Sequence, residues 1–430
     1  RTMLIKRDKY LKDLILRQNN GLIKVITGMR RCGKSYLLNQ IFFGWLLTNG
    51  VDDGHIIRLA FDSAEDLEKM GESLLEIKKQ KRLANPSLFI EYIKTKIKDD
   101  ENYYLLLDEV QLLENFESVL NGYLYKQNID IYVTGSNSRF LSKDVVTEFR
   151  GRGDLVHVLP LSFSEFYSFR SGDKYEAWND YFVYGGLPFV ATLKTEEQKI
   201  SYLDNLFKET YLKDIIERNK IRKSEELENL VDVLASGIGS LTNVGKIQKT
   251  FASTIKSKIS CDTIKDYVEY LKDSFVLNEA SRYNIKGRKY IGAQQKYYFE
   301  DVGLRNARLK FRQNEENHIM ENIIYNELRY RGFQVDVGIV EKRSADGKKN
   351  VQLEVDFVAN KGSQRFYIQS AFSLNSSEKE FQEKQSLQNL RDSFKKIIVT
   401  KGPLKLCRDD SGIETVGILE FLLNVGDILK

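Results

Sequence analysis

Cysteine, histidine and proline are scarce in this sequence of 430 residues, and each scarcity excludes a class of protein. The three cysteines and three histidines lie far apart in the chain, at Cys32, Cys261, Cys407, His55, His157 and His318. Their scatter excludes a disulfide framework and a cysteine-type zinc site, and it favours a reducing cytoplasm. The four prolines are too few for a proline-rich linker or a disordered chain.

Long apolar runs and a strong charge imbalance are also missing. No stretch reaches the roughly 18 uninterrupted apolar residues of a membrane span, and residues 1–8 lack the apolar segment of a signal peptide. We therefore expect a cytoplasmic protein with no membrane partner. The net charge of +5, from 66 basic and 61 acidic residues, permits a nucleic-acid partner without requiring one.

A glycine-rich loop near the start of the chain carries the clearest chemical signal. Residues 22–27 have the composition of a buried strand, residues 28–35 match the pattern G-x-x-x-x-G-K-[ST], and helical apolar spacing follows. In such a loop the backbone N–H groups surround phosphate oxygens. Lys34 would then reach the β- and γ-phosphates and the Ser35 hydroxyl would bind Mg²⁺, so we expect ATP and Mg²⁺ as cofactors. The expected nucleotide-binding residues are Gly28, Arg31, Cys32, Gly33, Lys34, Ser35 and Tyr36.

Two further strands are expected to end beside this loop. Residues 103–107 are apolar and run into Asp108 and Glu109, which indicates that Asp108 helps to hold Mg²⁺ and that Glu109 polarises the attacking water. Residues 129–134 end in a small polar segment, where Ser136 or Asn137 would orient that water; an ordinary polar turn is the alternative.

Two arginines follow this third strand. Arg150 and Arg152 lie in a loop that suits an arginine finger supplied to a neighbouring subunit, and Arg152 is favoured over Arg150. A basic surface loop is the alternative. A finger acting between subunits predicts a ring oligomer, with a hexamer as the candidate size. The absence of an [NT]-K-x-D motif after the acidic pair disfavours a guanine-nucleotide switch.

The middle of the chain divides into two helical segments. Residues 161–224 open with the capping box of Ser162 and Glu165, and we expect them to form a lid over the nucleotide. Residues 225–300 predict three short helices, the second and third capped by Asn243 and Ser260, and then two strands around a basic tip.

This second segment has the order of a winged helix, for which DNA binding and protein packing are both known roles. Its candidates for contacts with DNA phosphates are Lys265, Lys272, Arg288 and Lys289.

The last segment, residues 301–430, has the element order of the nuclease core called PD-(D/E)XK. A helix at 321–330 is followed by strands at 333–340, 353–358 and 365–371, then by a helix and a strand at 395–400. Such a core places a carboxylate on one strand and (D/E)-x-K on the next, which together hold Mg²⁺ and activate water.

The residues at these positions depart from the nuclease pattern. Asp356 takes the first position, and Glu321 is the acidic residue of the helix. Gln369 and Ala371 stand where the second carboxylate and the lysine belong, and an amide is a weaker metal ligand than a carboxylate. We therefore expect a nuclease fold without cleavage activity, retained for DNA binding or assembly.

Taken together, these features resemble the prokaryotic ATPases that pair an AAA-type domain (AAA_14) with a C-terminal region called DUF4143. The resemblance implies an α/β protein with a P-loop AAA-type ATPase core at 1–160, a helical lid at 161–224, a winged helix at 225–300 and a restriction-endonuclease-like α/β domain at 301–430. It covers nearly the whole chain and rests on the segments 28–35, 107–111, 134–137, 160–163, 184–188 and 296–305.

Three functions compete on this evidence from the sequence. The favoured one is an oligomeric Mg²⁺-dependent ATPase that binds and remodels DNA, with branched DNA among the candidate forms. The second is a nucleotide-dependent switch or scaffold that acts on protein partners without stimulation by DNA. The third is an ATP-regulated DNA nuclease, which needs Asp356 and a substitute lysine such as Lys379 or Lys384.

Overall fold

The computed structural model describes the chain except residues 1–4, 136–148, 150, 313–314, 345–349 and 375. The chain divides into two compact units, residues 1–160 and 161–430, each with a sheet of its own. Within the described ranges, none of the helices combines the length and the apolar character that crossing a membrane requires.

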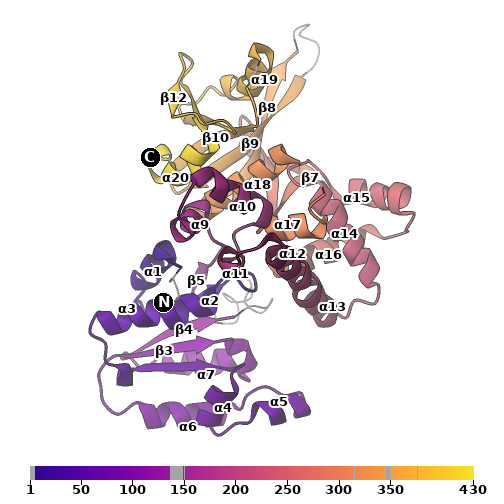
Figure 1. Cartoon of the computed structure of the whole chain (residues 1–430). Coiled ribbons are helices and arrows are strands. Elements are labelled where there is room, and N and C mark those ends of the chain that lie inside the picture. The colour runs from indigo at the N-terminus through magenta and orange to yellow at the C-terminus, as the bar shows by residue number, and fades with distance from the viewer. Residues whose placement is uncertain (1–4, 136–148, 150, 313–314, 345–349, 375) are drawn as a thin grey trace. The chain divides into compact units, whose positions relative to one another are not determined.

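The described residues of the first unit build a five-stranded parallel sheet in the order β2-β3-β4-β1-β5 (Figure 1). The strands are β1 (Ile23–Thr27), β2 (Ile56–Ala60), β3 (Tyr103–Asp108), β4 (Ile129–Thr134) and β5 (Gly153–His157). The helical elements are α1 (Asp8–Ile15), α2 (Lys34–Tyr36), η1 (Leu37–Phe42), α3 (Phe43–Thr48), η2 (Asp53–His55), α4 (Ala64–Lys69), α5 (Leu74–Gln80), α6 (Pro86–Lys96), η3 (Val110–Leu112) and α7 (Phe116–Tyr123). The segments α2, η1 and α3 follow one another as a single helical run.

Helices cover both faces of this sheet, as a parallel sheet requires. On one face, Leu105 and Ile131 pack with Phe89 of α6 and Leu120 of α7. On the other face, the Tyr132 ring lies 4.5 Å from the Phe42 ring of η1, between ring centroids. With both faces buried, the carboxyl ends of the strands remain as the edge where functional loops gather.

The second unit is helical at its start and has an eight-stranded sheet in the order β12-β13-β11-β10-β9-β8-β6-β7 among its described residues. Its helical elements are α9 (Phe163–Arg170), α10 (Lys174–Tyr184), α11 (Pro188–Thr192), α12 (Glu196–Asn205), η5 (Leu206–Leu212), α13 (Lys213–Asn219), α14 (Ser224–Ser236), α15 (Val244–Thr250), η6 (Phe251–Ile255), α16 (Cys261–Asp273), α17 (Val302–Arg308), α18 (Glu316–Tyr330), α19 (Ser377–Gln388) and α20 (Ile418–Ile428). Its strands are β6 (Leu277–Asn284), β7 (Lys289–Phe299), β8 (Gln334–Arg343), β9 (Asn350–Lys361), β10 (Gln364–Ala371), β11 (Lys395–Thr400), β12 (Cys407–Arg408) and β13 (Ile413–Gly417).

The hairpin that was predicted as a wing is part of this large sheet. The expected three helices (α14, α15, α16) and the hairpin β6–β7 are present, but β6 pairs in parallel with β8 through residues 282–284 and 337–339. The boundary predicted at residue 300 therefore falls inside one continuous sheet. A winged helix separate from the C-terminal sheet is not confirmed, because backbone hydrogen bonds join its hairpin to β8.

Two of the segments that carry the resemblance pack against each other. The Asp301 carboxylate caps α17 and accepts hydrogen bonds from the backbone nitrogens of Gly186 at 2.8 Å and Leu304 at 3.0 Å. A Cβ atom on Gly303 would lie 2.0 Å from the Tyr184 carbonyl oxygen, so only glycine fits there. Burial raises the pKa of Asp301 to about 6. These segments thus fix how α10 packs on α17.

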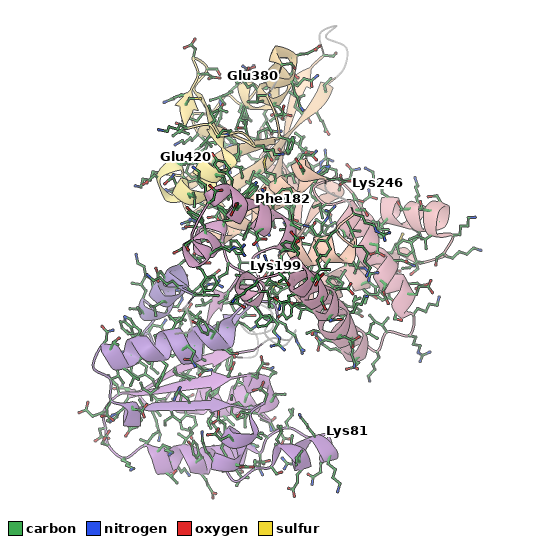
Figure 2. All side chains as sticks on the ribbon, in the orientation of Figure 1. Lys81, Phe182, Lys199, Lys246, Glu380 and Glu420 are labelled. Atoms are coloured by element: carbon green, nitrogen blue, oxygen red, sulfur yellow. The ribbon has the colours of Figure 1, made fainter. Side chains whose placement is uncertain are left out.

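The segment that was predicted as a lid is helical from α9 to α13. Ser162 and Glu165 form the expected capping box at the start of α9. Lys199, labelled in Figure 2, is buried within this segment, and its Nζ donates to Asp180 at 2.7 Å. The role of the segment as a lid stays a prediction.

Candidate functional site

The glycine-rich loop follows β1 and is held in place by residues from outside it. Gly28 has a φ of 145°, and a Cβ atom there would lie 2.2 Å from the carbonyl oxygen of Val158. The Cys32 carbonyl oxygen accepts a hydrogen bond from Nη1 of the buried Arg7 at 3.2 Å. Arg7 also donates through Nη2 to the Leu159 carbonyl oxygen at 2.6 Å. The loop is therefore fixed both to α1 and to the end of β5.

Lys34 lies in the curve of this loop. Gly33 precedes it in a left-handed conformation, with a φ of 99°, and the helix begins at Lys34. The Lys34 side chain is buried, and its Nζ donates to the carbonyl oxygens of Gly28 at 2.9 Å and Met29 at 2.8 Å. This position is where the lysine of a P-loop meets phosphate oxygens.

The remaining predicted nucleotide-binding residues differ in exposure. Arg31 is exposed and has a φ of 65°, which is uncommon for a residue other than glycine. Tyr36 is half-buried in α2, and burial raises its pKa against the opposing effect of a hydrogen bond with the Ile5 backbone.

Asp108 is the polar centre of the site. It ends β3 and is buried, and its Oδ1 accepts a hydrogen bond from Ser35 Oγ at 3.0 Å and another from Thr134 Oγ1. Its Oδ2 accepts from Asn39 Nδ2 at 3.3 Å. A carboxylate and a hydroxyl are the hard oxygen donors that Mg²⁺ prefers. The glycine cradle, the lysine ammonium and these donors together fit ATP with Mg²⁺.

Glu109 stands next to Asp108 in an unusual backbone conformation. Its φ of 50° lies in the left-handed region, where residues other than glycine are strained. Its backbone nitrogen donates to Thr134 Oγ1 at 3.1 Å, and its carboxylate accepts from Gln111 Nε2. Thr134 thus links both acidic residues, a role that the sequence analysis did not assign to it.

A further carboxylate, Asp62, was missed by the sequence analysis. It follows β2, whose last residue, Ala60, pairs with Asp108 in the sheet. Burial, followed by repulsion from Asp108, raises the pKa of Asp62. The signal in the sequence was an aspartate just after a short apolar strand, which is the same signal that identified Asp108.

Arg152 lies beside the amino-terminal end of β1, whereas the glycine-rich loop follows the carboxyl end of that strand. Its carbonyl oxygen accepts from the Ile23 nitrogen at 2.9 Å, at the start of β1, and its guanidinium lies over the Tyr125 ring at 5.5 Å from the centroid. The five residues of β1 separate it from the loop by about 16 Å. The predicted residues Ser136, Asn137 and Arg150 lie outside the described residues.

The nuclease-like positions meet around a lysine that the sequence analysis missed. Lys296 of β7 is 3% exposed in its side chain, and its Nζ lies 2.9 Å from Glu321 Oε1, 2.6 Å from Glu354 Oε1 and 3.4 Å from Asp356 Oδ1. The Tyr298 hydroxyl donates to Glu321 Oε1 at 2.6 Å. Glu321 and Asp356 therefore do come together, with an ammonium group between them.

The pKa values in this cluster follow from its mixture of burial and charge. Burial opposes the charge on Lys296, but the three carboxylates outweigh it and raise the lysine pKa. Burial likewise acts against ionisation of Glu321, yet Lys296 lowers its pKa. Burial and the charge of Glu321 raise the pKa of Asp356. One ammonium group thus faces three carboxylates, and negative charge remains in excess in this cluster.

Gln369 is occupied by structural hydrogen bonds. Its Oε1 accepts from the Asp356 backbone nitrogen at 3.2 Å, and its Nε2 donates to Glu383 at 3.1 Å. Lys384, one of the substitute lysines considered above, instead pairs with Glu380 at 2.6 Å and Asp409 at 2.8 Å. Among the residues that the structure describes, no group of three or more His, Cys, Asp or Glu side chains is arranged to hold a metal ion.

The candidates for DNA contacts lie in two places. Lys272 of α16 pairs with Glu269 at 2.8 Å and Glu279 at 3.2 Å, and Lys265 lies 3.6 Å from Asp262. Arg288 and Lys289 are exposed at the tip of the β6–β7 hairpin. Of these four candidates, only Arg288 and Lys289 form no ion pair with a described residue.

The parallel sheet, the loop after β1 and the acidic pair after β3 define a P-loop domain of the AAA type. In agreement, residues 20–167 match the family described as AAA domain (AAA_14). Residues 175–315 match a family described as domain of unknown function (DUF8612). The AAA_14 part of the predicted resemblance is confirmed, whereas the DUF4143 region and the nuclease-like domain are not.

Two relatives cover most of the chain. A Haemophilus influenzae protein described as uncharacterized is 31% identical over 426 residues, which are 98% of this chain and 99% of that protein. The chain belongs to the same family as this protein. An uncharacterized protein of Methanocaldococcus jannaschii is 28% identical over 394 residues, 88% of this chain and 81% of its own length.

Solved structures give weak global superpositions. The Aeropyrum pernix ORC1 protein, in complex with DNA, is 13% identical and covers 71% of this chain and 93% of its own, with a TM-score of 0.28. AMPPCP-bound DnaA from Aquifex aeolicus is 15% identical and covers 62% of this chain and 86% of its own, with a TM-score of 0.29. Superpositions with such TM-scores carry no conclusion about this chain.

Proposed function

We propose that this protein is a Mg²⁺-dependent ATPase whose site is built from the loop after β1 and the end of β3. The main support for this proposal is the buried Asp108, which accepts a hydrogen bond from Ser35 at 3.0 Å beside the loop that holds Lys34. When bound, Mg²⁺ would neutralise charge on the phosphate groups. Ser35 and Asp108 would hold it, and Lys34 would bind the β- and γ-phosphates.

Glu109 would polarise the attacking water as the general base. Its left-handed backbone and the hydrogen bond from its nitrogen to Thr134 fix its position relative to Asp108. Asp62 supplies a further carboxylate at the same edge, since β2 pairs with β3 up to Asp108.

The position of Arg152 supports action between subunits. Arg152 lies at the amino-terminal end of β1, and the loop lies at the carboxyl end of the same strand. Its side chain would therefore reach only the nucleotide of a neighbouring copy. This arrangement favours a ring oligomer in which hydrolysis depends on assembly. Mixing tests it directly, since Arg152→Ala and Lys34→Ala subunits would each be inactive alone and would recover turnover when combined. Mixtures that stay inactive would contradict a finger at Arg152.

We further propose that the ATPase acts on DNA and that its C-terminal domain does not cut it. The exposed Arg288 and Lys289 at the hairpin tip support contact with phosphates. The ammonium of Lys296 among the carboxylates supports the loss of cleavage, because it stands where nuclease chemistry would need a divalent cation.

Steady-state ATP hydrolysis at fixed salt tests the DNA part of this proposal. The rate would be measured without DNA and with linear duplex, single strand and four-way junction, and Lys34→Ala would control for contaminating ATPases. We expect at least one DNA form to raise the rate severalfold, without Mg²⁺-dependent cleavage of that DNA. Turnover that depends on Lys34 but ignores every DNA form would instead favour a nucleotide switch acting on protein partners.

A further inference from the structure

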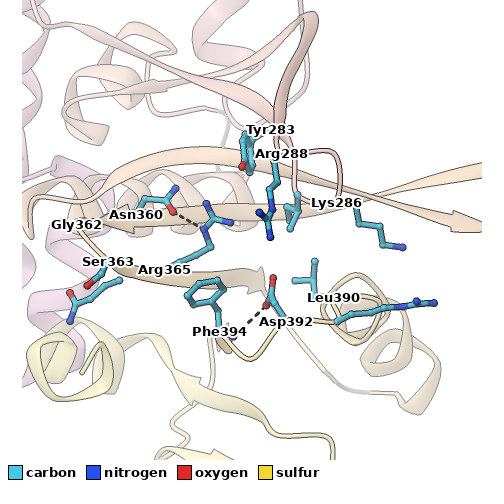
Figure 3. Close-up of a pocket in the computed structure, with 13 residues that line it drawn as sticks. Tyr283, Lys286, Arg288, Asn360, Gly362, Ser363, Arg365, Leu390, Asp392 and Phe394 are labelled. Carbon is cyan, nitrogen blue, oxygen red and sulfur yellow. Dashed lines mark hydrogen bonds between the residues drawn. The ribbon is translucent and has the colours of Figure 1, made fainter.

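The second unit contains a basic cavity beside the hairpin tip that carries Arg288. It has a volume of about 680 Å³ and is bounded by the tip of the β6–β7 hairpin, the turn between β9 and β10, and the segment between α19 and β11. This volume lies within the range of small-ligand sites in proteins. Figure 3 shows the guanidinium groups of Arg288 and Arg365 pointing into this space, with Asp392 and Phe394 across from them.

Positive charge dominates the walls of this cavity. Its lining contains four basic side chains (Lys286, Arg288, Arg365 and Arg391) and a single acidic one, Asp392. Asp392 is already engaged, because its carboxylate accepts from the Tyr367 hydroxyl at 2.7 Å and from the Phe394 backbone nitrogen at 3.3 Å. In Figure 3 the Lys286 side chain extends away from this space, and its Nζ donates to the Glu341 carbonyl oxygen at 2.7 Å. Arg288 and Arg365 are therefore the cations that face the cavity.

The arginines differ in how firmly they are held. Arg365 donates through Nε to Asn360 Oδ1 at 2.8 Å, and its guanidinium lies between two rings, 5.6 Å from the centroid of Tyr283 and 5.5 Å from that of Phe394. Arg288 makes no hydrogen bond or ion pair with any residue that the structure describes. The cavity thus combines a preorganised guanidinium with one whose donors are available to a ligand.

We propose that this cavity binds the phosphate group of a nucleotide, with Arg288 and Arg365 on the phosphate oxygens and Phe394 against the base. The proposal deepens the proposed action on DNA and rests on it, because it places a contact of the nucleic acid at the hairpin tip. The planar guanidinium offers paired N–H donors that match phosphate oxygens.

The Phe394 ring in the lining favours a nucleotide over an inorganic anion as the ligand of this cavity. Phe394 is 40% exposed, although it is a large apolar side chain. An exposed ring beside arginines is the combination that binds single-stranded nucleic acids, because bases stack on the ring while the arginines hold the backbone. An inorganic ion would leave this ring uncovered.

The same chemistry occurs in free nucleotides and at the ends of nucleic acid chains, and the binding test separates these sources. The full-length protein would be titrated into a short oligothymidylate labelled at its 3′ end, with and without a 5′ phosphate, and binding would be followed by fluorescence anisotropy. Binding of AMP alone would be measured by isothermal titration calorimetry. The same titrations with Lys34→Ala would exclude binding at the loop after β1.

Arg288→Ala is the informative variant, because Arg288 is exposed and its side chain makes no hydrogen bond or ion pair with a described residue. Arg222→Ala is its matched control, since Arg222 is also an exposed arginine of the second unit and lies outside the cavity lining. We expect Arg288→Ala to weaken binding of the phosphorylated oligonucleotide about tenfold, the usual effect of losing hydrogen bonds to a charged group. Arg222→Ala would bind like the wild type.

The possible results distinguish failure of the cavity proposal from failure of the proposed action on DNA. Equal binding by Arg288→Ala and the wild type overturns the cavity proposal but leaves the proposed action on DNA standing. AMP binding that depends on Arg288, without binding of any oligonucleotide, supports the cavity with a free nucleotide as its ligand and contradicts a contact with DNA at the hairpin tip. If no probe binds the wild-type protein, the cavity proposal fails, and the hydrolysis assay with duplex and junction DNA decides the proposed action on DNA.

Discussion

Replacing Lys296 by methionine would test the account of the buried lysine–carboxylate cluster. The methionine fills a similar volume but removes the ammonium group from between Glu321, Glu354 and Asp356. Removing one partner of a buried ion pair costs about 3–5 kcal/mol, because the remaining charge is left without compensation. Glu354 is 32% exposed and contributes less, so we expect a loss of about 3 kcal/mol at neutral pH.

The assay follows unfolding of the second unit in urea by tryptophan fluorescence. The chain has two tryptophans, Trp45 in the first unit and the buried Trp178 in the second, so a Trp45→Phe background isolates the second unit. Lys401→Met is the control, because Lys401 forms an exposed ion pair with Glu316, and such pairs contribute about 1 kcal/mol or less.

The pH dependence of this effect separates charge from packing. Without the ammonium group, burial raises the folded-state pKa values of Glu321 and Asp356, so the variant is more stable where these groups are protonated and loses that stability as pH rises. In the wild type, the lowered pKa of Glu321 means that its contribution is lost as pH falls. The two stabilities therefore converge in acid. A cost like that of Lys401→Met, or one that does not change with pH, would refute the reasoning.

Three further predictions follow from single residues. Gly28→Ala would abolish nucleotide binding in a titration with a fluorescent ATP analogue, because the added Cβ would lie 2.2 Å from a carbonyl oxygen. The control Gly44→Ala would bind normally, because a Cβ there meets no atom within 4 Å. Glu109→Gln would lower kcat for ATP hydrolysis about 10²–10⁴-fold with nucleotide affinity retained, the usual share of a general base; an unchanged kcat would reassign the base. Burial raises the pKa of Glu327 from 4.5 to about 7, so the folded state holds its proton and stability falls by roughly 3 kcal/mol as pH rises through this interval. Glu327→Gln would remove that slope in the Trp45→Phe background, and a slope that persists would contradict this assignment.

Local signals in the sequence predicted much of the fold. Asn243 and Ser260 cap α15 and α16 as expected, because a cap depends only on residues within one turn of it. The strands that position Lys34 and Asp108 were also recognisable, since a parallel sheet buried on both faces leaves continuous apolar runs in the sequence.

The parts that the sequence analysis missed depend on contacts between distant segments. Lys296 reaches Glu321 and Asp356 because β7 lies at the end of a sheet in which β6 joins β8, and no local pattern encodes that pairing. Arg7 was missed for the same reason, since it acts on the Cys32 carbonyl from another part of the chain.

The most direct test of the central claim is ATP turnover by the purified full-length protein with Mg²⁺. Lys34→Ala removes the ammonium group from the loop, and Lys12→Ala, an exposed lysine of α1, serves as the matched control. The account predicts hydrolysis by the wild type and by Lys12→Ala, and none above background by Lys34→Ala. Turnover that survives in Lys34→Ala, or its absence from the wild type under every condition that allows nucleotide binding, would contradict the assignment of this site as an ATPase.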